Sequence, residues 1–308
     1  MSDIDTALDD YLMVRRSLGH KLAGAEYLLR SFLAFLDQAG AARITTDLAV
    51  SWATLPVGAS AVYQAQRLSA VRRFASWLES IEPATEVPPT DILTSRPRRA
   101  AAYLYKDDEI AAIMAATQSL RYPMRRYTYE GLIGLLVASG LRVGEAIRLD
   151  RGDVCFGPGL LRVLGSKFGK SREVPLHPST VEALQRYSER RDELCPEPRS
   201  ASFFLGVAGT RLVYESVNSV FKRLLAHAGL GVRVGRGGPR IHDFRHTFAT
   251  NTLVEWCRAG ADVHAMLPLL STYMGHVDPK STFWYLSATP ELLGLAASRL
   301  EDAFEVER

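Results

Sequence analysis

Four short segments of the chain carry cationic, imidazole and phenolic side chains that suit phosphate chemistry. In the first, Gly140 ends one predicted helix, and Arg142 lies at the start of the next. An arginine at a helix N-terminus lies beside backbone N–H donors, which favours an anion. Glu145, one turn later, could orient Arg142 through paired hydrogen bonds. Taken alone, the pair also fits a surface ion pair between residues three apart.

The second segment, Gly165-Ser-Lys-Phe-Gly-Lys-Ser-Arg, places Lys167 and Lys170 in a glycine-containing turn between two predicted strands. A lysine in such a turn can reach a phosphate or donate a proton to a leaving oxygen. An ordinary polar hairpin tip would look the same. The segment is not a P-loop, because it lacks a Gly-x-x-x-x-Gly-Lys-Ser/Thr pattern opening a helix.

The third segment is Arg240-Ile-His-Asp-Phe-Arg-His-Thr-Phe-Ala-Thr. His242 and Arg245 are three residues apart, so they share one face of a predicted helix. His246 follows His242 by four residues, which raises the alternative of a metal site. No His-Glu-x-x-His arrangement or obvious third ligand accompanies them, so we predict no bound metal.

The fourth segment contains Gly275-His276 and, nine residues after the histidine, Tyr285. Gly275 suits a helix end, and His276 would then lie just beyond it. A tyrosine near a helix end is most often a core or interface residue. The segment therefore carries no functional prediction by itself.

The elements that must position these residues form two predicted domains. Residues 1–82 read as a helical domain, because apolar residues recur at helical spacing. Residues 83–100 hold Pro83, Pro88, Pro89 and Pro97, which predicts a linker. Residues 101–308 should be mainly α, with one small antiparallel sheet over 153–175. Helices are predicted at 179–194, 213–228, 241–257, 263–274, 279–286 and 290–304.

Charge is unevenly placed along the chain. Lys plus Arg is 37 and Asp plus Glu is 34, a net charge of only +3. A basic stripe nevertheless runs over 211–245, and further arginines lie on the predicted helix 61–78, where a solvated face is the alternative to phosphate contact. We predict that the DNA-contacting residues are Arg67, Arg72, Arg73, Arg211, Lys222, Arg223 and Arg240.

Composition also excludes several classes of protein. Cys155, Cys195 and Cys257 lack metal-ligand spacing, and three cysteines do not make a secreted disulfide scaffold. The acidic N-terminus lacks the apolar run of a signal peptide, and no apolar stretch is long enough to span a bilayer. We expect a cytoplasmic protein with no membrane partner.

Taken together, the order Arg…Lys…His-x-x-Arg…His…Tyr resembles the tyrosine recombinase, or phage integrase, family. The resemblance rests on Leu141-Arg-Val-Gly-Glu145, Lys167 in its hairpin, His242-Asp-Phe-Arg-His-Thr-Phe-Ala-Thr250, Gly275-His276 and Tyr285. It covers residues 100–305 strongly and residues 1–95 in outline, as a helical core-binding domain. It implies an α+β catalytic domain following that helical domain.

The resemblance implies a metal-free transesterification without a cofactor. Tyr285 would attack the scissile phosphate, form a 3′-phosphotyrosyl link and release a 5′-hydroxyl. Lys167 would protonate the departing oxygen, with Lys170 as the competing candidate. The other implied roles are phosphate binding by Arg142 and Arg245, general-base catalysis by His242, a hydrogen bond to phosphate from His276, and support of the site by Glu145.

The implied partner is double-stranded DNA, held between the two domains by a clamp. Recombination would use a synaptic tetramer, with other recombinases or accessory proteins as further partners, and residues 291–300 could dock on a neighbouring protomer. We expect a recombinase from a mobile element. A chromosome-dimer-resolving recombinase, a type IB topoisomerase, a hairpin-forming resolvase and a non-cleaving architectural DNA-binding protein are the alternatives.

Overall fold

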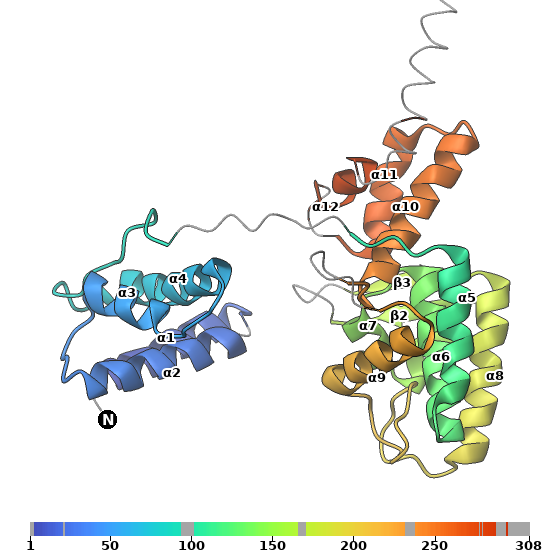
Figure 1. The fold of residues 1–308 in the computed structure, drawn as a ribbon, viewed down its shortest axis with the longest axis horizontal. Helices are drawn as coiled ribbons and strands as arrows, with labels where there is room; N and C mark the ends of the chain where they lie inside the picture. Colours follow the sequence, from blue (N-terminus) through green and yellow to red (C-terminus); the bar gives the residue numbers. More distant parts are fainter. Residues whose placement is uncertain are drawn as a thin grey trace, which may run out of the picture. The chain divides into compact units, whose positions relative to one another are not determined.

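The computed structural model describes residues 3–20, 22–93, 102–165, 171–231, 238–276, 278, 280–287 and 294. The chain divides into two compact units, Met1–Arg99 and Ala100–Arg308 (Figure 1). Each unit has its own core of buried apolar side chains. The described residues are mainly helical with one small antiparallel sheet, so the predicted fold class is confirmed.

The first unit is built from four helices, coloured blue in Figure 1: α1 (Asp3–Ser17), α2 (Ala23–Gln38), α3 (Thr46–Thr54) and α4 (Ala61–Leu78). Thr45 and Ser60 cap α3 and α4, because their hydroxyl groups accept hydrogen bonds from the Leu48 and Tyr63 backbone N–H groups at 3.3 and 3.2 Å. Phe32, Trp52 and Phe74 fill the centre of the core.

Residues after α4 remain attached to this unit. Val87, Ile92 and Leu93 pack against its core. The Arg72 guanidinium donates hydrogen bonds to the carbonyl oxygens of Pro88 and Pro89, at 2.7 and 2.6 Å. The first part of the predicted linker is therefore packed on the four helices, while residues 94–101 lie outside the described part of the chain.

The second unit is organised around the buried helix α6 (Pro123–Ser139), which packs against α5 (Asp107–Ala116), α8 (Pro178–Leu194) and α10 (Asp243–Arg258). The short helix α7 (Val143–Arg148) follows α6 after a turn, and α9 (Tyr214–His227) packs against α5 and α7. Close packing of α6 on α8 depends on Gly131, whose Cβ would lie 3.3 Å from the Tyr187 ring.

The sheet joins three short strands in the order β1 (Val154–Cys155), β2 (Leu160–Val163) and β3 (Arg172–Pro175). Both pairs are antiparallel, with Leu161 opposite Val174 and Val163 opposite Arg172. Leu161, Val163 and Val174 are buried, so one face of the sheet joins the core. This arrangement brings β3 toward α7 and α11 (Val263–Met274).

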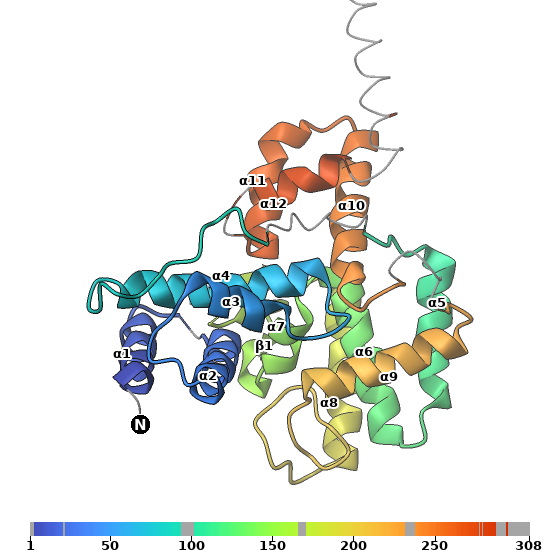
Figure 2. The same cartoon turned by 60° about the vertical axis from the view of Figure 1, so that its left-hand side comes forward.

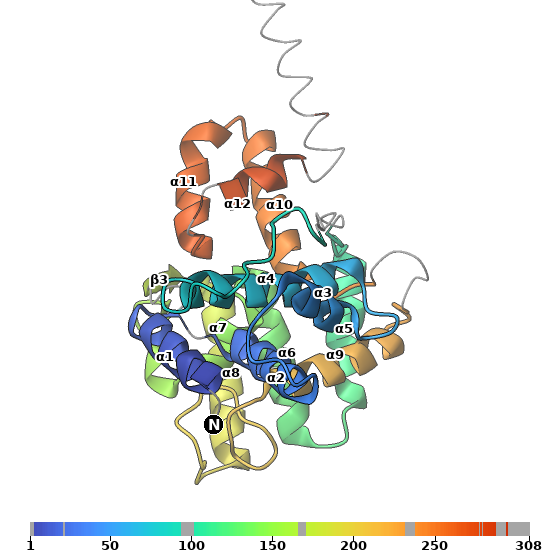
Figure 3. The same ribbon diagram turned by 90° about the vertical axis from the view of Figure 1, so that its left-hand side faces the viewer.

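The last described helices form a second, smaller core in this unit. Figures 2 and 3 both show α10, α11 and α12 (Lys280–Phe283) grouped together. A 3₁₀ helix, Trp284–Ser287, continues α12 and places Tyr285 in the same core as Leu253, Leu267 and Met274. Of the predicted helix 290–304, only residue 294 is described.

No helix among the described residues is both long enough and apolar enough to cross a membrane.

Candidate active site

Arg142 is the first residue of the site, and Glu145 holds it from both ends. Gly140 ends α6 in the left-handed conformation, with φ of 59°, so the chain reverses before α7 begins. The Arg142 backbone N–H donates to one Glu145 carboxylate oxygen at 3.1 Å, and Nη1 donates to the other at 2.8 Å. The pair is thus a helix cap combined with a charged hydrogen bond, as the spacing suggested.

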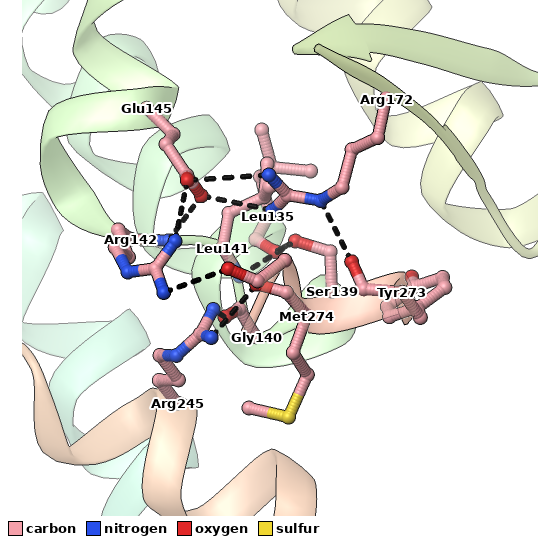
Figure 4. A network of polar contacts seen from close by, with 11 residues as sticks. Leu135, Ser139, Gly140, Leu141, Arg142, Glu145, Arg172, Arg245, Tyr273 and Met274 are labelled. Carbon is pink, nitrogen blue, oxygen red and sulfur yellow. Dashed lines mark hydrogen bonds and ion pairs between the residues drawn. The ribbon is translucent and has the colours of Figure 1, made fainter. Parts of the chain in front are cut away.

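A third arginine, Arg172, completes this network (Figure 4). Its two terminal nitrogens donate to the Glu145 oxygens at 3.2 and 3.0 Å, and its Nε donates to the Tyr273 carbonyl oxygen at 2.8 Å. Burial raises the pKa of Glu145, but Arg172 and Arg142 more than offset this, so that the pKa lies below its ordinary value. Glu145 is therefore an ionised carboxylate shared by two guanidinium groups.

Sequence reasoning did not include Arg172 in the site. One signal could have found it: the residue lies two positions before the buried Val174, so strand alternation turns it to the core side of the sheet. A charged side chain directed to that side needs a buried partner. The identity of the partner, Glu145, comes only from the fold.

Arg245 lies on α10 and points into the same region. It is 2% exposed, and its two terminal nitrogens donate to the carbonyl oxygens of Gly140 and Met274, at 2.8 and 2.7 Å. Arg142 donates to the next carbonyl, that of Gly275, at 3.1 Å. The two arginines therefore converge on the turn after α11, as Figure 4 shows. Burial and Arg142 lower the pKa of Arg245 to about 10, which still leaves it charged at neutral pH.

Gly275 makes this convergence possible. It caps α11 in the left-handed conformation, with φ of 67°. A Cβ at this position would lie 2.6 Å from Nη1 of Arg172, closer than real Cβ atoms come to other heavy atoms. The glycine thus serves both the turn and the close approach of the arginine.

The predicted histidines lie around these cations. His276 follows the turn, and its Nδ1 is 2.7 Å from the Thr282 hydroxyl oxygen. Burial and the three arginines, led by Arg245, lower the pKa of His276 to about 3. His242 precedes α10 with an exposed side chain, and desolvation together with Arg245 lowers its pKa. His276 is thus uncharged at neutral pH, and for His242 the shift also favours the uncharged form.

Tyr285 is buried among these residues, with 3% of its surface exposed. Its ring is stacked near the His276 ring, with centroids 6.2 Å apart. Its hydroxyl oxygen is 3.1 Å from Nδ1 of His246. The His242 ring, predicted to serve Tyr285 as a base, lies perpendicular to the His246 ring at a centroid distance of 5.2 Å. The structure therefore brings Tyr285 together with His276, and places His246 at its hydroxyl.

The two candidate lysines, Lys167 and Lys170, lie in the segment 166–170, outside the described residues. The strands on either side of that segment are described, and Arg172 at the start of β3 bonds to Glu145. The strand residues that flank the segment, Val163 and Arg172, pair with each other, and Arg172 belongs to the arginine network.

Some of the predicted DNA-contacting residues are exposed, and others are hydrogen-bonded to groups of the protein itself. Lys222 and Arg223 on α9 and Arg73 on α4 are exposed. Arg211 bonds to the Ile147 carbonyl oxygen and the Asp150 carboxylate, and Arg240 pairs with Asp243 at 2.8 Å. Arg72 has carbonyl partners within its own unit, as described above.

Arg67 requires a correction. It was expected on the surface of α4, but it is 7% exposed and donates to the Trp52 carbonyl oxygen at 2.7 Å. Its guanidinium carbon also lies 3.7 Å from the centroid of the Trp52 ring, a cation–π contact. Arg67 therefore joins α4 to α3, and its buried position does not fit the predicted contact with DNA.

The arrangement as a whole is suited to binding an anion. Two of its three guanidinium groups, those of Arg142 and Arg172, share the single carboxylate of Glu145. Their other hydrogen bonds, and those of Arg245, go to neutral carbonyl groups. The excess positive charge would be stabilised by a phosphate. Among the described residues, no cluster of histidine, cysteine and carboxylate side chains has the composition of a metal site.

Comparison with known proteins gives consistent matches. The profile described as the Phage integrase family matches residues 104–291. The protein y4rB of Sinorhizobium fredii, which is named as an integrase/recombinase, is 42% identical over 99% of both chains. The tyrosine recombinase XerC of Rhodospirillum centenum is 30% identical and covers 90% of this chain and 82% of its own.

Solved structures share the fold. The integrase of transposon Tn1549 in complex with a circular intermediate DNA superposes with a TM-score of 0.67 at 16% identity, covering 97% of this chain and 100% of that chain. A lambda integrase tetramer bound to a Holliday junction gives 0.61 at 18% identity, covering 92% and 78%.

Proposed function

Because the chain belongs to the phage integrase family of tyrosine recombinases, we propose that it cleaves and rejoins DNA strands at specific sites through a 3′-phosphotyrosyl intermediate. The observation that carries this proposal is a buried tyrosine, Tyr285, that interacts electrostatically with Arg245, while Arg245 and Arg142 converge on the same turn. The whole site has the charge needed for a phosphodiester and holds a side chain able to attack it.

The two arginines supply the main electrostatic stabilisation. As the Tyr285 oxygen attacks phosphorus, negative charge grows on the non-bridging oxygens of the phosphate. Arg142 and Arg245 are permanently charged at neutral pH and can donate paired hydrogen bonds to those oxygens. Glu145 and Arg172 keep Arg142 in place, and an uncharged His276 can add a further hydrogen bond to phosphate.

Proton transfer completes the reaction. The phenol must lose its proton as its oxygen bonds to phosphorus, and we assign His242 as the general base. The bond from phosphorus to the 5′-oxygen breaks, and Lys167 protonates that oxygen, with Lys170 as the competing acid. The energy of the broken bond is kept in the phosphotyrosyl link, so a second 5′-hydroxyl can be joined without ATP.

The partners follow from the same proposal. Both units contact the DNA duplex, with Arg73, Lys222 and Arg223 as exposed cations available to phosphates. A tetramer assembles on the recombining duplexes, as the lambda integrase tetramer bound to a Holliday junction supports. The similarity to y4rB and the shared fold with the Tn1549 integrase support a role in a mobile element. The protein would then act in the cytoplasm, at the nucleoid.

The test begins by finding the DNA site. The protein is expressed in bacteria, covalent protein–DNA adducts are isolated under denaturing conditions, and the attached DNA is sequenced. A nicked duplex carrying the recovered sequence then traps the adduct, because the short strand beyond the nick diffuses away after cleavage.

Wild-type protein should form the adduct, while Tyr285→Phe should bind the duplex with equal affinity and form none. Arg245→Lys should bind DNA but lose at least about 100-fold in adduct formation, because lysine cannot donate the paired hydrogen bonds. An adduct on Tyr285→Phe, or the absence of any adduct with the wild-type protein, would contradict the proposal.

A further inference from the structure

His246 lies at the Tyr285 hydroxyl and has no role in the proposed reaction as described so far. A hydroxyl buried with its tyrosine must be hydrogen-bonded, because burying it without a partner costs free energy. The structure gives it Nδ1 of His246 at 3.1 Å, with the two ring centroids 5.5 Å apart. His246 is half-buried and follows Arg245 directly in α10.

The position of His246 on α10 explains how it reaches Tyr285. Successive residues of a helix point about 100° apart, so Arg245 and His246 face different neighbours. Arg245 turns toward the carbonyls of Gly140 and Met274. His246 shares its face with Ala249 and Leu253, at spacings of three and seven residues, and both belong to the core that contains Tyr285. Adjacent residues of one helical turn thus provide Arg245, which would bind phosphate, and His246, which contacts the nucleophile.

The protonation state of His246 is compatible with this contact. Desolvation and the neighbouring His242 lower its pKa to about 4, so the imidazole is neutral at physiological pH. A neutral imidazole accepts a hydrogen bond at one ring nitrogen and donates from the other. In the tautomer that carries its proton on Nε2, Nδ1 of His246 accepts the hydrogen bond of the Tyr285 hydroxyl.

We propose that His246 is a positioning residue for the nucleophile: by accepting the hydrogen bond of the Tyr285 hydroxyl, it holds the attacking oxygen beside the arginines that bind the phosphate. The inference rests on the proposed role of Tyr285. It separates two tasks within one motif, because His242 is the exposed histidine and His246 the one in contact with the hydroxyl. Misplacing an attacking atom by about 1 Å can lower a rate by about 100-fold.

Two substitutions separate positioning from a merely structural role. His246→Asn keeps an acceptor oxygen near the place of Nδ1 but cannot take up a proton near neutral pH. His246→Leu is similar in volume and removes the acceptor. Adduct formation is timed with the nicked duplex of recovered sequence, while DNA affinity and thermal unfolding are measured for each variant. His264→Asn, an exposed histidine on α11, is the matched control.

We expect His246→Leu to bind the duplex normally and to form the adduct about 100-fold more slowly, and His246→Asn to remain within about fivefold of the wild-type rate. Equal rates for His246→Leu and the wild-type protein would overturn the proposal. A His246→Asn variant as slow as His246→Leu would also overturn it, because an acceptor alone would then not suffice. If the wild-type protein itself forms no adduct, the proposed function fails first, and the two failures are distinguished.

Discussion

At the residue scale, phosphate binding depends on the N–H donors of Arg245 that are not hydrogen-bonded within the protein. A guanidinium has five N–H donors. The hydrogen bonds of Arg245 to the carbonyls of Gly140 and Met274 hold its plane in place through two of them. Donors therefore remain for phosphate oxygens, and the side chain needs little reorganisation when the substrate binds. Preorganised donors of this kind are the strongest source of transition-state stabilisation.

Single substitutions can also show whether Lys167 or Lys170 is the general acid. Lys167→Ala should slow adduct formation by about 100-fold or more, since the leaving 5′-oxygen would depart without a proton. Lys170→Ala should stay near the wild-type rate. A duplex with sulfur in place of the bridging 5′-oxygen should restore cleavage by Lys167→Ala, because a thiolate leaves without protonation. Rescue of Lys170→Ala instead would assign the role to Lys170.

At the scale of elements, the site is assembled at helix ends. Gly140 ends α6 and Gly275 ends α11, both in the left-handed conformation. The carbonyl groups exposed at these ends accept hydrogen bonds from Arg142 and Arg245. Helix C-termini carry partial negative charge and favour cations. The helix ends therefore hold the arginines, and the arginines in turn join α7, α10 and α11.

Gly275→Ala tests this assembly. Alanine in the left-handed conformation costs about 1–2 kcal/mol, and the collision of its Cβ with Arg172 should add about 1–3 kcal/mol. Gly260→Ala is the matched control, because Gly260 has φ of 74° but open space around the Cβ position. Both variants should unfold at lower temperature in calorimetry, Gly275→Ala by the larger amount. Only Gly275→Ala should also slow adduct formation, and equal effects of the two would contradict the role of Arg172.

At the scale of the whole molecule, the chain consists of two units, and each is stabilised by its own core. The small net charge of +3 conceals a catalytic centre in which cations outnumber carboxylates. It also conceals an exposed pair of cations, Lys222 and Arg223, on α9. The affinity for DNA should therefore depend on where charge is placed and on the concentration of salt.

Salt dependence measures the phosphate contacts. The double variant Lys222→Ala/Arg223→Ala should weaken binding to all duplexes and lower the slope of log affinity against log salt by about 2, or about 1 for each lost contact. Arg190→Ala on α8 removes an exposed arginine that pairs with Glu193 at 2.8 Å, and it should leave the slope unchanged. Fluorescence anisotropy between low and moderate salt gives both slopes. A slope unaltered in the double variant would exclude α9 from the DNA contacts.

The stability of the protein in acid depends on two half-buried histidines, His246 and His276. The pKa values of His246 and His276 are lowered to about 4 and about 3 from an ordinary value of 6.5, so below pH 6.5 the unfolded chain binds more protons than the folded one. Their contribution to stability is present above pH 6.5 and is lost as the pH falls toward 4. The melting temperature should decline between pH 6.5 and 4.5, and less steeply in His246→Asn. An identical decline in both proteins would contradict the lowered pKa of His246.

The sequence by itself determined the fold class, most helix positions and the order of the chemical groups, because these depend on local periodicity and on residue types at set spacings. The prediction that Glu145 orients Arg142 followed from such a local spacing, and the structure shows that contact. Only the tertiary structure decided which distant groups meet. Arg172 reaches Glu145 across 27 residues, and His246 reaches Tyr285 across 39. Arg67 is directed inward onto Trp52 by the packing of α4 on α3. Helical spacing says which residues share a face, whereas the neighbour of that face depends on how the whole chain packs.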